Sequence, residues 1–276
     1  MNSPQAPSDA RAAATARLAS ASGVPVVLAR PALPGTYACV VLLHERYGLV
    51  EHTEHFAATL AADGLVVLAP NLFYGSGDPD TVRRGEAKVE PRDPAVLAAL
   101  REVTALFGGI AGADATRLAM VGVCQTGRYP FVYGAAHPLR ARVTIYGAAQ
   151  DREWAVNERF PQGLDALIAA SDAPVLGLFG EKDHAISVDH VRRLRDALER
   201  HDRSYRVTVY AGAPHGWLNE TMPGRYRPAI AARALAELRE FLAEALAPEP
   251  VAPAVRWRFT CEKASDYDFS RNERLG

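Results

Sequence analysis

Cys124 lies in a short run, Gly122-Val123-Cys124-Gln125-Thr126-Gly127, whose residue types suit covalent catalysis. An apolar stretch that predicts a strand comes before it, and a predicted helix follows. Small residues two positions away on either side, Gly122 and Thr126, permit the sharp, strained turn that exposes a nucleophile. The start of the helix would favour the thiolate and direct backbone N–H groups at a developing oxyanion. The run predicts a nucleophilic cysteine, and the alternative is a buried cysteine in an ordinary turn.

Two other predicted strand ends carry groups that could activate such a thiol. Asp183 comes just after a late strand, and His215 lies in a turn of small residues after the last one. In this interpretation Cys124 attacks a carbonyl carbon, His215 transfers protons, and Asp183 fixes the histidine tautomer and stabilises its cation. Glu181 and Asp189 are alternatives for the acid.

A carboxylate follows a further predicted strand, in the run Leu43-His44-Glu45-Arg46-Tyr47-Gly48. Glu45 could deprotonate Cys124 or hold a cationic group of a substrate. The alternative is a structural ion pair with Arg46 or another arginine.

The elements that must position these residues are seven runs of branched apolar residues and four helix-patterned stretches. The strands are predicted at 25–29, 38–43, 65–69, 118–123, 142–146, 175–179 and 205–210, and the helices at 52–62, 94–107, 188–200 and 229–246. Their alternation predicts a mainly parallel sheet with helices on both faces. Ligands of such sheets bind beyond the carboxyl ends of the strands. The order nucleophile, acid, histidine is that of the α/β-hydrolase fold.

We expect one α/β-hydrolase domain over residues 24–247. Residues 1–23 are rich in alanine, serine and proline and are predicted to be a flexible, frayed segment. Residues 248–276 pass through a Pro/Ala linker into a polar, aromatic tail that packs on the domain or on a partner. Residues 71–92 are polar and Gly-rich and predict a long loop that caps a site.

Composition excludes several classes of function. The net charge is -1 in 276 residues, with no basic stripe, so the expected partner is a small molecule or another protein and not nucleic acid. No apolar run has the roughly 18–20 residues of a membrane-spanning helix. The setting is expected to be reduced and cytoplasmic, and the sequence leaves the oligomeric state open.

The cysteines and histidines predict neither a disulfide framework nor a metal site. The remaining two of the three cysteines are interpreted as a buried small hydrophobe, Cys39, and an exposed thiol, Cys261. His52 and His55 lie on one face of a helix beside two glutamates, but no further ligand follows at a suitable spacing. A solvated helix start is expected, with no metal and no cofactor.

At this point the sequence resembles the dienelactone hydrolase family (carboxymethylenebutenolidases) over about residues 24–246. The resemblance rests on four motifs: the Gly-x-Cys turn at 122–124, His44-Glu45-Arg46-x-Gly48, Gly180-x-x-Asp183 and Pro214-His215-Gly216. It implies a triad of Cys124, His215 and Asp183 and a cofactor-free hydrolysis of a lactone or ester through a cysteine acyl-enzyme. It also implies that Glu45 accepts the thiol proton when substrate binds. The oxyanion donors would be the backbone N–H groups of Gln125 and Arg46.

Family members resemble each other in holding a carboxylate of the lactone with arginines, one of them four residues after the histidine. Asn219 stands at that position here. Three arginines are possible substitutes, and each could equally be an ordinary surface residue: Arg83, Arg84 and Arg128. Three aromatic residues could wall an apolar pocket or belong to the core: Tyr47, Tyr74 and Trp217. Competing functions are a non-hydrolytic enzyme of the same fold, such as an isomerase, cyclase or acyltransferase, and a non-catalytic protein that binds a partner.

Overall fold

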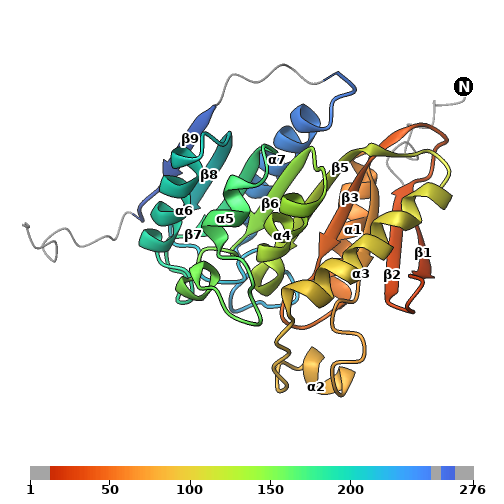
Figure 1. Cartoon of the computed structure of the whole chain (residues 1–276), viewed down its shortest axis with the longest axis horizontal. Coiled ribbons are helices and arrows are strands. Elements are labelled where there is room, and N and C mark those ends of the chain that lie inside the picture. Colours follow the sequence, from red (N-terminus) through yellow and green to blue (C-terminus); the bar gives the residue numbers. More distant parts are fainter. Residues whose placement is uncertain (1–12, 250–255, 265–276) are drawn as a thin grey trace, which may run out of the picture.

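The computed structural model of the chain describes residues 13–249 and 256–264. Within them, nine strands form one sheet in the order β1-β2-β4-β3-β5-β6-β7-β8-β9 (Figure 1). The strands β1 and β2 pair antiparallel, as do β2 and β4, and all later neighbours pair parallel. Their bounds are β1 (Ala13–Ala19), β2 (Pro25–Pro31), β3 (Tyr37–Leu43), β4 (Val66–Pro70), β5 (Ala113–Val123), β6 (Ala141–Ile145), β7 (Val175–Gly180), β8 (Tyr205–Tyr210) and β9 (Trp257–Cys261).

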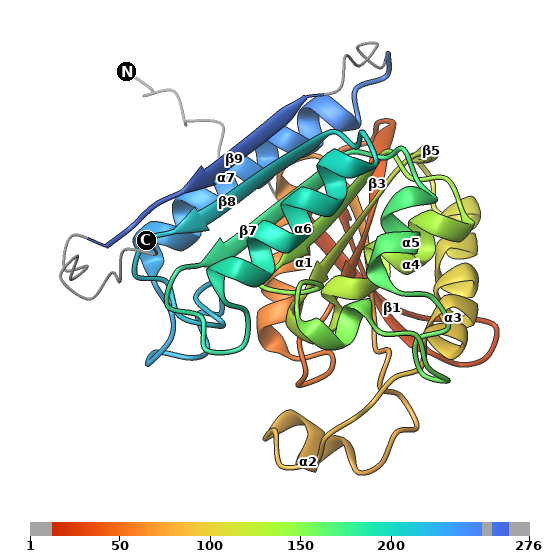
Figure 2. The same cartoon turned by 60° about the vertical axis from the view of Figure 1, so that its left-hand side comes forward.

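Helices cover both faces of this sheet (Figures 1 and 2). Side chains of α1 and α7 enter the apolar cluster on one face, and side chains of α3, α4, α5 and α6 enter the cluster on the other. The helices are α1 (Glu51–Ala62), α2 (Pro79–Arg83), α3 (Asp93–Ala105), α4 (Tyr129–Ala136), α5 (Leu164–Ala169), α6 (Val188–Arg200) and α7 (Pro228–Ala245). The prediction of a mainly parallel α/β sheet between helical layers is confirmed.

The central strand β5 shows why the apolar runs of the sequence become strands with two buried faces. Leu118 and Met120 enter one apolar cluster, and Ala119, Val121 and Val123 enter the other. Successive side chains of a strand point to opposite faces, so a continuous apolar run suits a strand that is covered on both sides. Cys124 follows directly at the carboxyl end of this strand.

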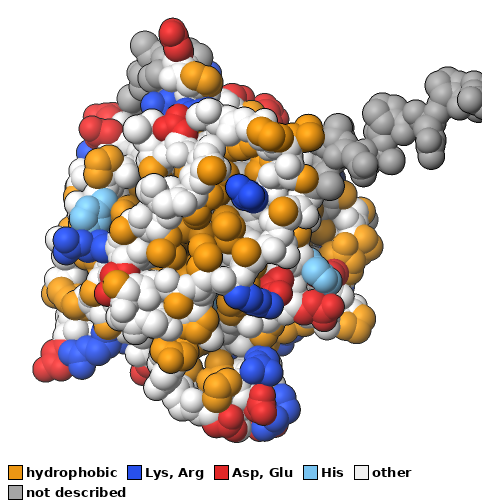
Figure 3. Space-filling view, turned by 90° about the vertical axis from the view of Figure 1, so that its right-hand side faces the viewer, with side chains coloured by type: hydrophobic (Ala, Val, Ile, Leu, Met, Phe, Trp, Pro, Cys, Tyr) orange, Lys and Arg blue, Asp and Glu red, His pale blue; other side chains and the backbone are white. Residues whose placement is uncertain are grey.

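The prediction of a frayed segment over residues 1–23 is wrong for the part that the structure describes. Residues 13–19 form β1, which pairs with β2 in an unbroken antiparallel register. Its connection to β2 is fastened because Ser20 and Ser22 both donate hydrogen bonds to Glu102 Oε2, at 2.7 and 2.6 Å. Alanine has a low strand propensity, so the sequence concealed this strand. Figure 3 looks onto this side of the molecule, where apolar side chains spread across the middle of the surface.

Part of the C-terminal segment also belongs to the sheet. The strand β9 pairs parallel with β8, and Phe259 packs against the guanidinium of Arg195, 4.9 Å from its ring centre. Cys261, expected to be an exposed thiol, is half-buried in β9. The linker at 250–255 and the aromatic run after 264 lie outside the described residues. Cys39 is fully buried as expected, and burial raises the pKa of its thiol to about 12.

None of the helices in the described ranges is long and apolar enough to cross a membrane.

Because β9 covers the edge of β8, a chain that ends at residue 247 should expose an unpaired strand. We expect its melting temperature to fall by about 5 °C and its tendency to associate to rise. A chain that ends at residue 264 keeps β9 and is the matched control. Thermal denaturation and light scattering measure both effects. Equal behaviour of the two truncated chains would show that β9 adds nothing to the fold.

Candidate active site

Cys124 is the first residue after β5 and has a left-handed backbone, with φ of 56°. It opens a short 3-10 helix, Cys124–Arg128, that leads into α4. The turn leaves no room for side chains beside it. A Cβ atom at Gly122 would lie 2.4 Å from the carbonyl oxygen of Thr126, and one at Gly127 would lie 2.6 Å from Thr144 Oγ1. The sequence therefore folds here into a tight turn that holds the thiol above the strand end.

Thr126 connects this turn to the loop after β3. Its buried hydroxyl accepts a hydrogen bond from Val123 N (3.1 Å) and donates one to the carbonyl of His44 (2.7 Å). From the sequence, Thr126 was expected only to be a small neighbour of Cys124. In the structure it is a tether that fixes the cysteine turn against the residues around Glu45.

Three side chains form a continuous hydrogen-bonded chain at the strand ends. Cys124 Sγ lies 3.1 Å from His215 Nε2, and His215 Nδ1 lies 2.8 Å from Asp183 Oδ2. A carboxylate only accepts hydrogen bonds, so Nδ1 carries the proton and Nε2 faces the sulfur. The second oxygen, Oδ1, accepts from the backbone N–H groups of Ala185 (2.7 Å) and Ile186 (3.0 Å), which fix the Asp183 carboxylate.

The two alternative acids have other partners. Glu181 accepts from the backbone N–H groups of Gly212 (2.9 Å) and Ala264 (3.1 Å), so it fastens the segment after β9. Asp189 is exposed on α6 and pairs with Arg192 at 2.7 Å. Asp183 alone among the three contacts His215 in the described residues.

The electrostatic surroundings favour the protonated form of His215. Burial by itself would lower the pKa of this histidine, but the hydrogen bonds to Asp183 and Cys124 and the charges of these two groups outweigh it. Together they raise the pKa of His215 to about 10. At neutral pH an imidazolium therefore faces the sulfur atom.

Glu45 is buried, and two neutral donors hold its carboxylate. The hydroxyl of Tyr146 donates to Oε1 (3.1 Å), and Nδ2 of Asn219 donates to Oε2. The Asn219 Oδ1 accepts from the backbone N–H (3.0 Å) and hydroxyl (2.6 Å) of Thr221, which sets the orientation of its amide. The residue at the position of the family's arginine thus contacts Glu45.

His44 fixes the backbone of the Glu45 loop. The backbone N–H of Leu72 donates to Nε2 at 3.0 Å, so the proton of the neutral ring is on Nδ1, which donates to the carbonyl of Glu45 at 2.7 Å. Burial lowers the pKa of His44 to about 4. The ring is therefore a neutral structural group.

Tyr146 was not identified from the sequence, although it closes the predicted strand at 142–146. It is fully buried with a left-handed backbone (φ 37°), and its ring packs edge-on against His215 (5.1 Å) and Trp217 (5.5 Å). Burial and the nearby charge of Glu45 raise the pKa of Tyr146 well above its usual value, so the phenol remains a donor. Of the two interpretations of Trp217, pocket wall or core residue, the structure shows the second, because Trp217 is fully buried between Tyr146 and Tyr210.

A cavity of about 200 Å³ opens beside the thiol and the histidine. Its lining includes four basic side chains, Arg46, Lys88, Arg152 and Arg225. Of these four residues, only Arg46 was a predicted site residue, and it was predicted for its backbone N–H group. No signal in the sequence pointed to the other three, because they lie in segments that are far apart in the chain.

Several predicted substrate contacts lie outside the lining of this cavity. Arg83 and Arg84 are exposed and pair with acidic neighbours on the loop around α2, which projects from the body of the molecule (Figures 1 and 2). Tyr47 packs against Gly85, and Tyr74 is exposed. A place in or near the predicted loop at 71–92 therefore did not identify the residues that line the cavity.

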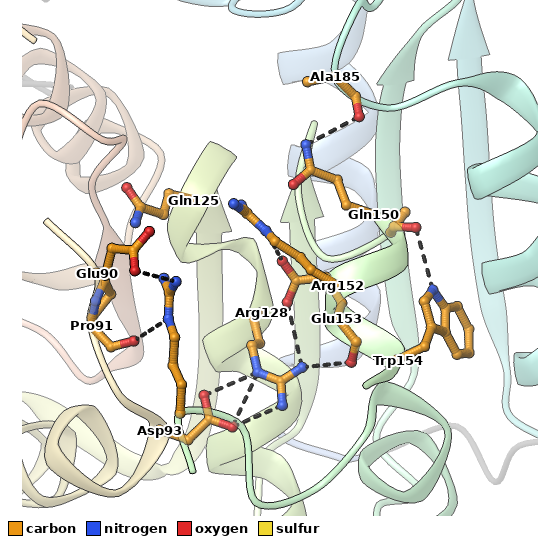
Figure 4. A network of polar contacts seen from close by, with 12 residues as sticks. Glu90, Pro91, Asp93, Gln125, Arg128, Gln150, Arg152, Glu153, Trp154 and Ala185 are labelled. Carbon is orange, nitrogen blue, oxygen red and sulfur yellow. Dashed lines mark hydrogen bonds and ion pairs between the residues drawn. The ribbon is translucent and has the colours of Figure 1, made fainter. Parts of the chain in front are cut away.

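Arg128 is a structural residue, contrary to its predicted role in binding substrate (Figure 4). Its side chain is 2% exposed and binds the carboxylate of Asp93 through Nε (3.0 Å) and Nη2 (2.8 Å). It also bonds to the carbonyl of Glu153 (2.9 Å) and lies over the ring of Phe160. The carboxylate of Glu153 bonds in turn to Arg152 Nε at 3.2 Å, at the wall of the cavity. The network fixes that wall.

The prediction of a solvated start of α1 is wrong for His52. His52 is buried, and its Nδ1 bonds to Glu220, the residue after Asn219. His55 contacts the other oxygen of the same carboxylate at 3.1 Å. The two histidines therefore hold the loop that carries His215. Within the described ranges no group of three or more metal-binding side chains occurs.

Comparison with known proteins assigns this arrangement to a family. The model of the dienelactone hydrolase family matches residues 24–246, most of the chain. The chain belongs to the dienelactone hydrolase family. It is 31% identical over 229 residues to a candidate carboxymethylenebutenolidase of Salmonella typhimurium, covering 80% of this chain and 83% of that protein. Like other members of the family, it is a hydrolase that acts on ester bonds.

Two further relatives extend the comparison. A crystal structure of a candidate dienelactone hydrolase from Klebsiella pneumoniae has a TM-score of 0.74 and 28% identity, and covers 84% of this chain and 99% of that one. A Bradyrhizobium protein named as a candidate 2-oxo-3-(5-oxofuran-2-ylidene)propanoate lactonase is 27% identical, covering 74% of this chain and 82% of its own. The family resemblance found in the sequence is confirmed.

The change Arg128→Met should leave Asp93 and Glu153 buried without their shared counter-charge. We expect a loss of about 3–5 kcal/mol in the free energy of unfolding, because unpaired buried charges are costly. Urea denaturation measures it, with the exposed Arg84→Met as a matched control whose midpoint should not move. Wild-type stability combined with a raised KM would instead favour the substrate-binding role.

The raised pKa of His215 predicts how stability depends on pH. Its ordinary pKa is 6.5 and the folded value is about 10, so its contribution is complete below pH 6.5 and is lost as the pH rises to about 10. The change Asp183→Asn removes the charge and keeps an oxygen for Ala185 and Ile186. We expect the wild type to be more stable than this variant by a margin that narrows between pH 6.5 and 10, measured by urea denaturation. A margin that widened with pH would contradict the assignment.

Proposed function

We propose that this protein hydrolyses a lactone or ester of a small molecule through an acyl-enzyme on Cys124. The observation that carries the proposal is the chain of contacts from Sγ to His215 (3.1 Å) and from His215 to Asp183 (2.8 Å). The names of the relatives as carboxymethylenebutenolidase and lactonase support the choice of an ester or lactone bond. No cofactor enters the proposed reaction.

In the proposed mechanism the thiolate attacks the carbonyl carbon, and the tetrahedral intermediate collapses with cleavage of the C–O bond. The imidazolium of His215 gives its proton to the leaving oxygen, which in a lactone stays attached to the acyl group as a free hydroxyl. Water then attacks the thioester while His215 accepts a proton. Cleavage of the C–S bond releases the thiolate and a carboxylic acid, the acid loses its proton to solvent, and the pair of Cys124 and His215 is restored.

Oxyanion stabilisation would come from two backbone N–H groups at the strand ends. The N–H of Gln125 follows the nucleophile on the turn, and the N–H of Arg46 lies in the loop after β3. The tether from Thr126 to His44 supports this pairing, because it fixes the two segments against each other (2.7 Å).

The role of Glu45 differs from the one implied by the resemblance. Both of its oxygens are already occupied, by Tyr146 and Asn219, and the thiol is already paired with His215. We infer that Glu45 is a positioning residue that holds Tyr146 against His215. Activation of the thiol would then precede substrate binding.

The basic lining of the cavity favours a substrate that carries a negative charge. Arg152 is held by Glu153, and Arg225 makes no side-chain ion pair within the described part of the chain. Arg225 lies against Gly216, the residue after His215. A Cβ atom at Gly216 would be 3.5 Å from Cδ of Arg225. We propose Arg225 and Arg152 as the contacts for a substrate carboxylate in place of the arginine that Asn219 replaces.

The covalent step is tested by intact-mass measurement after mixing the protein with a slow aryl ester. The wild type should gain the mass of the acyl group, and Cys124→Ala should gain nothing and lose turnover. Turnover or an adduct in the alanine variant would refute the cysteine mechanism.

Iodoacetamide without substrate tests how the thiol is activated. Alkylation of Cys124 at pH 7 should slow by about tenfold or more in His215→Gln and stay near the wild-type rate in Glu45→Gln. A large loss in Glu45→Gln with little change in His215→Gln would restore Glu45 as the base.

A further inference from the structure

Residues 85–92, here called the strap, connect α2 to α3 along one side of the catalytic cavity. Lys88, in the middle of the strap, lines the cavity together with Cys124 and His215. The sequence predicted a loop that caps the site over a wider range, residues 71–92. Only this part of the loop contributes a side chain to the cavity.

The strap is fastened to the two residues proposed as oxyanion donors. Arg46 Nη2 donates to the carbonyl of Gly85 at 2.8 Å, and Gln125 Nε2 donates to the carbonyl of Val89 at 2.7 Å. In each case the side chain holds the strap while the backbone N–H belongs to the proposed oxyanion site. The position of the strap is therefore mechanically coupled to both donors.

The end of the strap toward α3 is fastened separately (Figure 4). Arg159 donates from Nε to the carbonyl of Pro91 at 2.9 Å and pairs with Glu90 at 3.4 Å. The backbone N–H of Asp93 donates to the carbonyl of Arg159 at 3.0 Å, and the Asp93 side chain binds Arg128. The strap is thus held at both ends, and Lys88 lies between the anchors.

Lys88 can contact a ligand in the cavity, although it pairs with Glu90. Its side chain is 70% exposed, and its partner Glu90, at 3.2 Å, is exposed as well. Exposed ion pairs of this kind contribute little, so the ammonium group can turn toward an anion at small cost. Glu90 also pairs with Arg159, which compensates part of its charge.

We propose that the strap is part of the reaction site: Lys88 contacts an anionic group of the substrate, and the side chains of Arg46 and Gln125 are positioning residues that hold the oxyanion donors. The inference rests on the proposed function, because it takes Cys124 as the nucleophile. Its charge component can be measured without any turnover.

The first experiment compares alkylation of Cys124 by iodoacetate, an anion, and by iodoacetamide, its neutral analogue, followed by peptide mass mapping. At low salt, Lys88→Gln should slow the iodoacetate reaction by about fivefold and leave the iodoacetamide reaction within about twofold of wild type. Arg83→Gln, which changes an exposed cation of α2 that pairs with Asp80 outside the strap, is the matched control and should change neither rate. An equal change with both reagents, or no change, would overturn the role of Lys88.

The second experiment tests the anchors with Gln125→Met, which removes the amide donor and keeps the length of the side chain. We expect faster tryptic cleavage after Arg84 and Lys88, and a fall of about tenfold in kcat for a neutral aryl ester with little change in KM. Wild-type cleavage and wild-type kcat would overturn the positioning role. If the wild type alkylates at Cys124 but hydrolyses no ester, the proposed function fails, and the iodoacetate and cleavage comparisons still decide the inference about the strap.

Discussion

A φ of 56° at Cys124 costs an L residue about 1–2 kcal/mol, so the groups around the turn have to hold it in place. Gly122 and Gly127 let the backbone of the turn approach its neighbours within distances that a side chain would forbid. The hydroxyl of Thr126 then joins the turn to the loop after β3. The strained turn places the thiol in the lining of the cavity, within 3.1 Å of His215 Nε2.

Two buried carboxylates near this turn, those of Glu45 and Asp93, have different kinds of partner. Glu45 accepts hydrogen bonds from neutral groups, Tyr146 and Asn219, whereas Asp93 is neutralised by the buried cation Arg128. A buried ion pair resists change because loss of one partner leaves a bare charge. Neutral donors leave the charge of Glu45 uncompensated, and its field acts on the nearby Tyr146 phenol. The same part of the molecule thus contains a rigid wall and a carboxylate held by hydrogen bonds alone.

The sequence predicted the features that depend on chain order and local pattern. The apolar runs predicted the seven inner strands, and their ends located Cys124, Asp183 and His215 at one edge of the sheet. Features that depend on packing between distant segments were not predictable. Arg128 follows Cys124 by four residues, yet only the folded chain brings Asp93 and Glu153 around it.

Edge strands and the cavity lining escaped prediction for related reasons. The strand β1 is mainly alanine, and its place in the sheet is set by pairing with β2 and not by its own propensity. The basic residues of the cavity come from loops, whose conformations depend on contacts such as those of the strap with Arg46 and Gln125. Tyr146 could have been found by the rule that located the triad, since it follows β6 at the same edge.

The contact between Cys124 and His215 joins residues that are 91 positions apart in the chain. Translation proceeds from the N-terminus, and segments fold as they become available. Cys124 and its strained turn therefore leave the ribosome well before His215, the group proposed to activate the thiol, and β9 is made later still. The contact between the sulfur and the imidazole can form only when synthesis of the sheet is nearly complete.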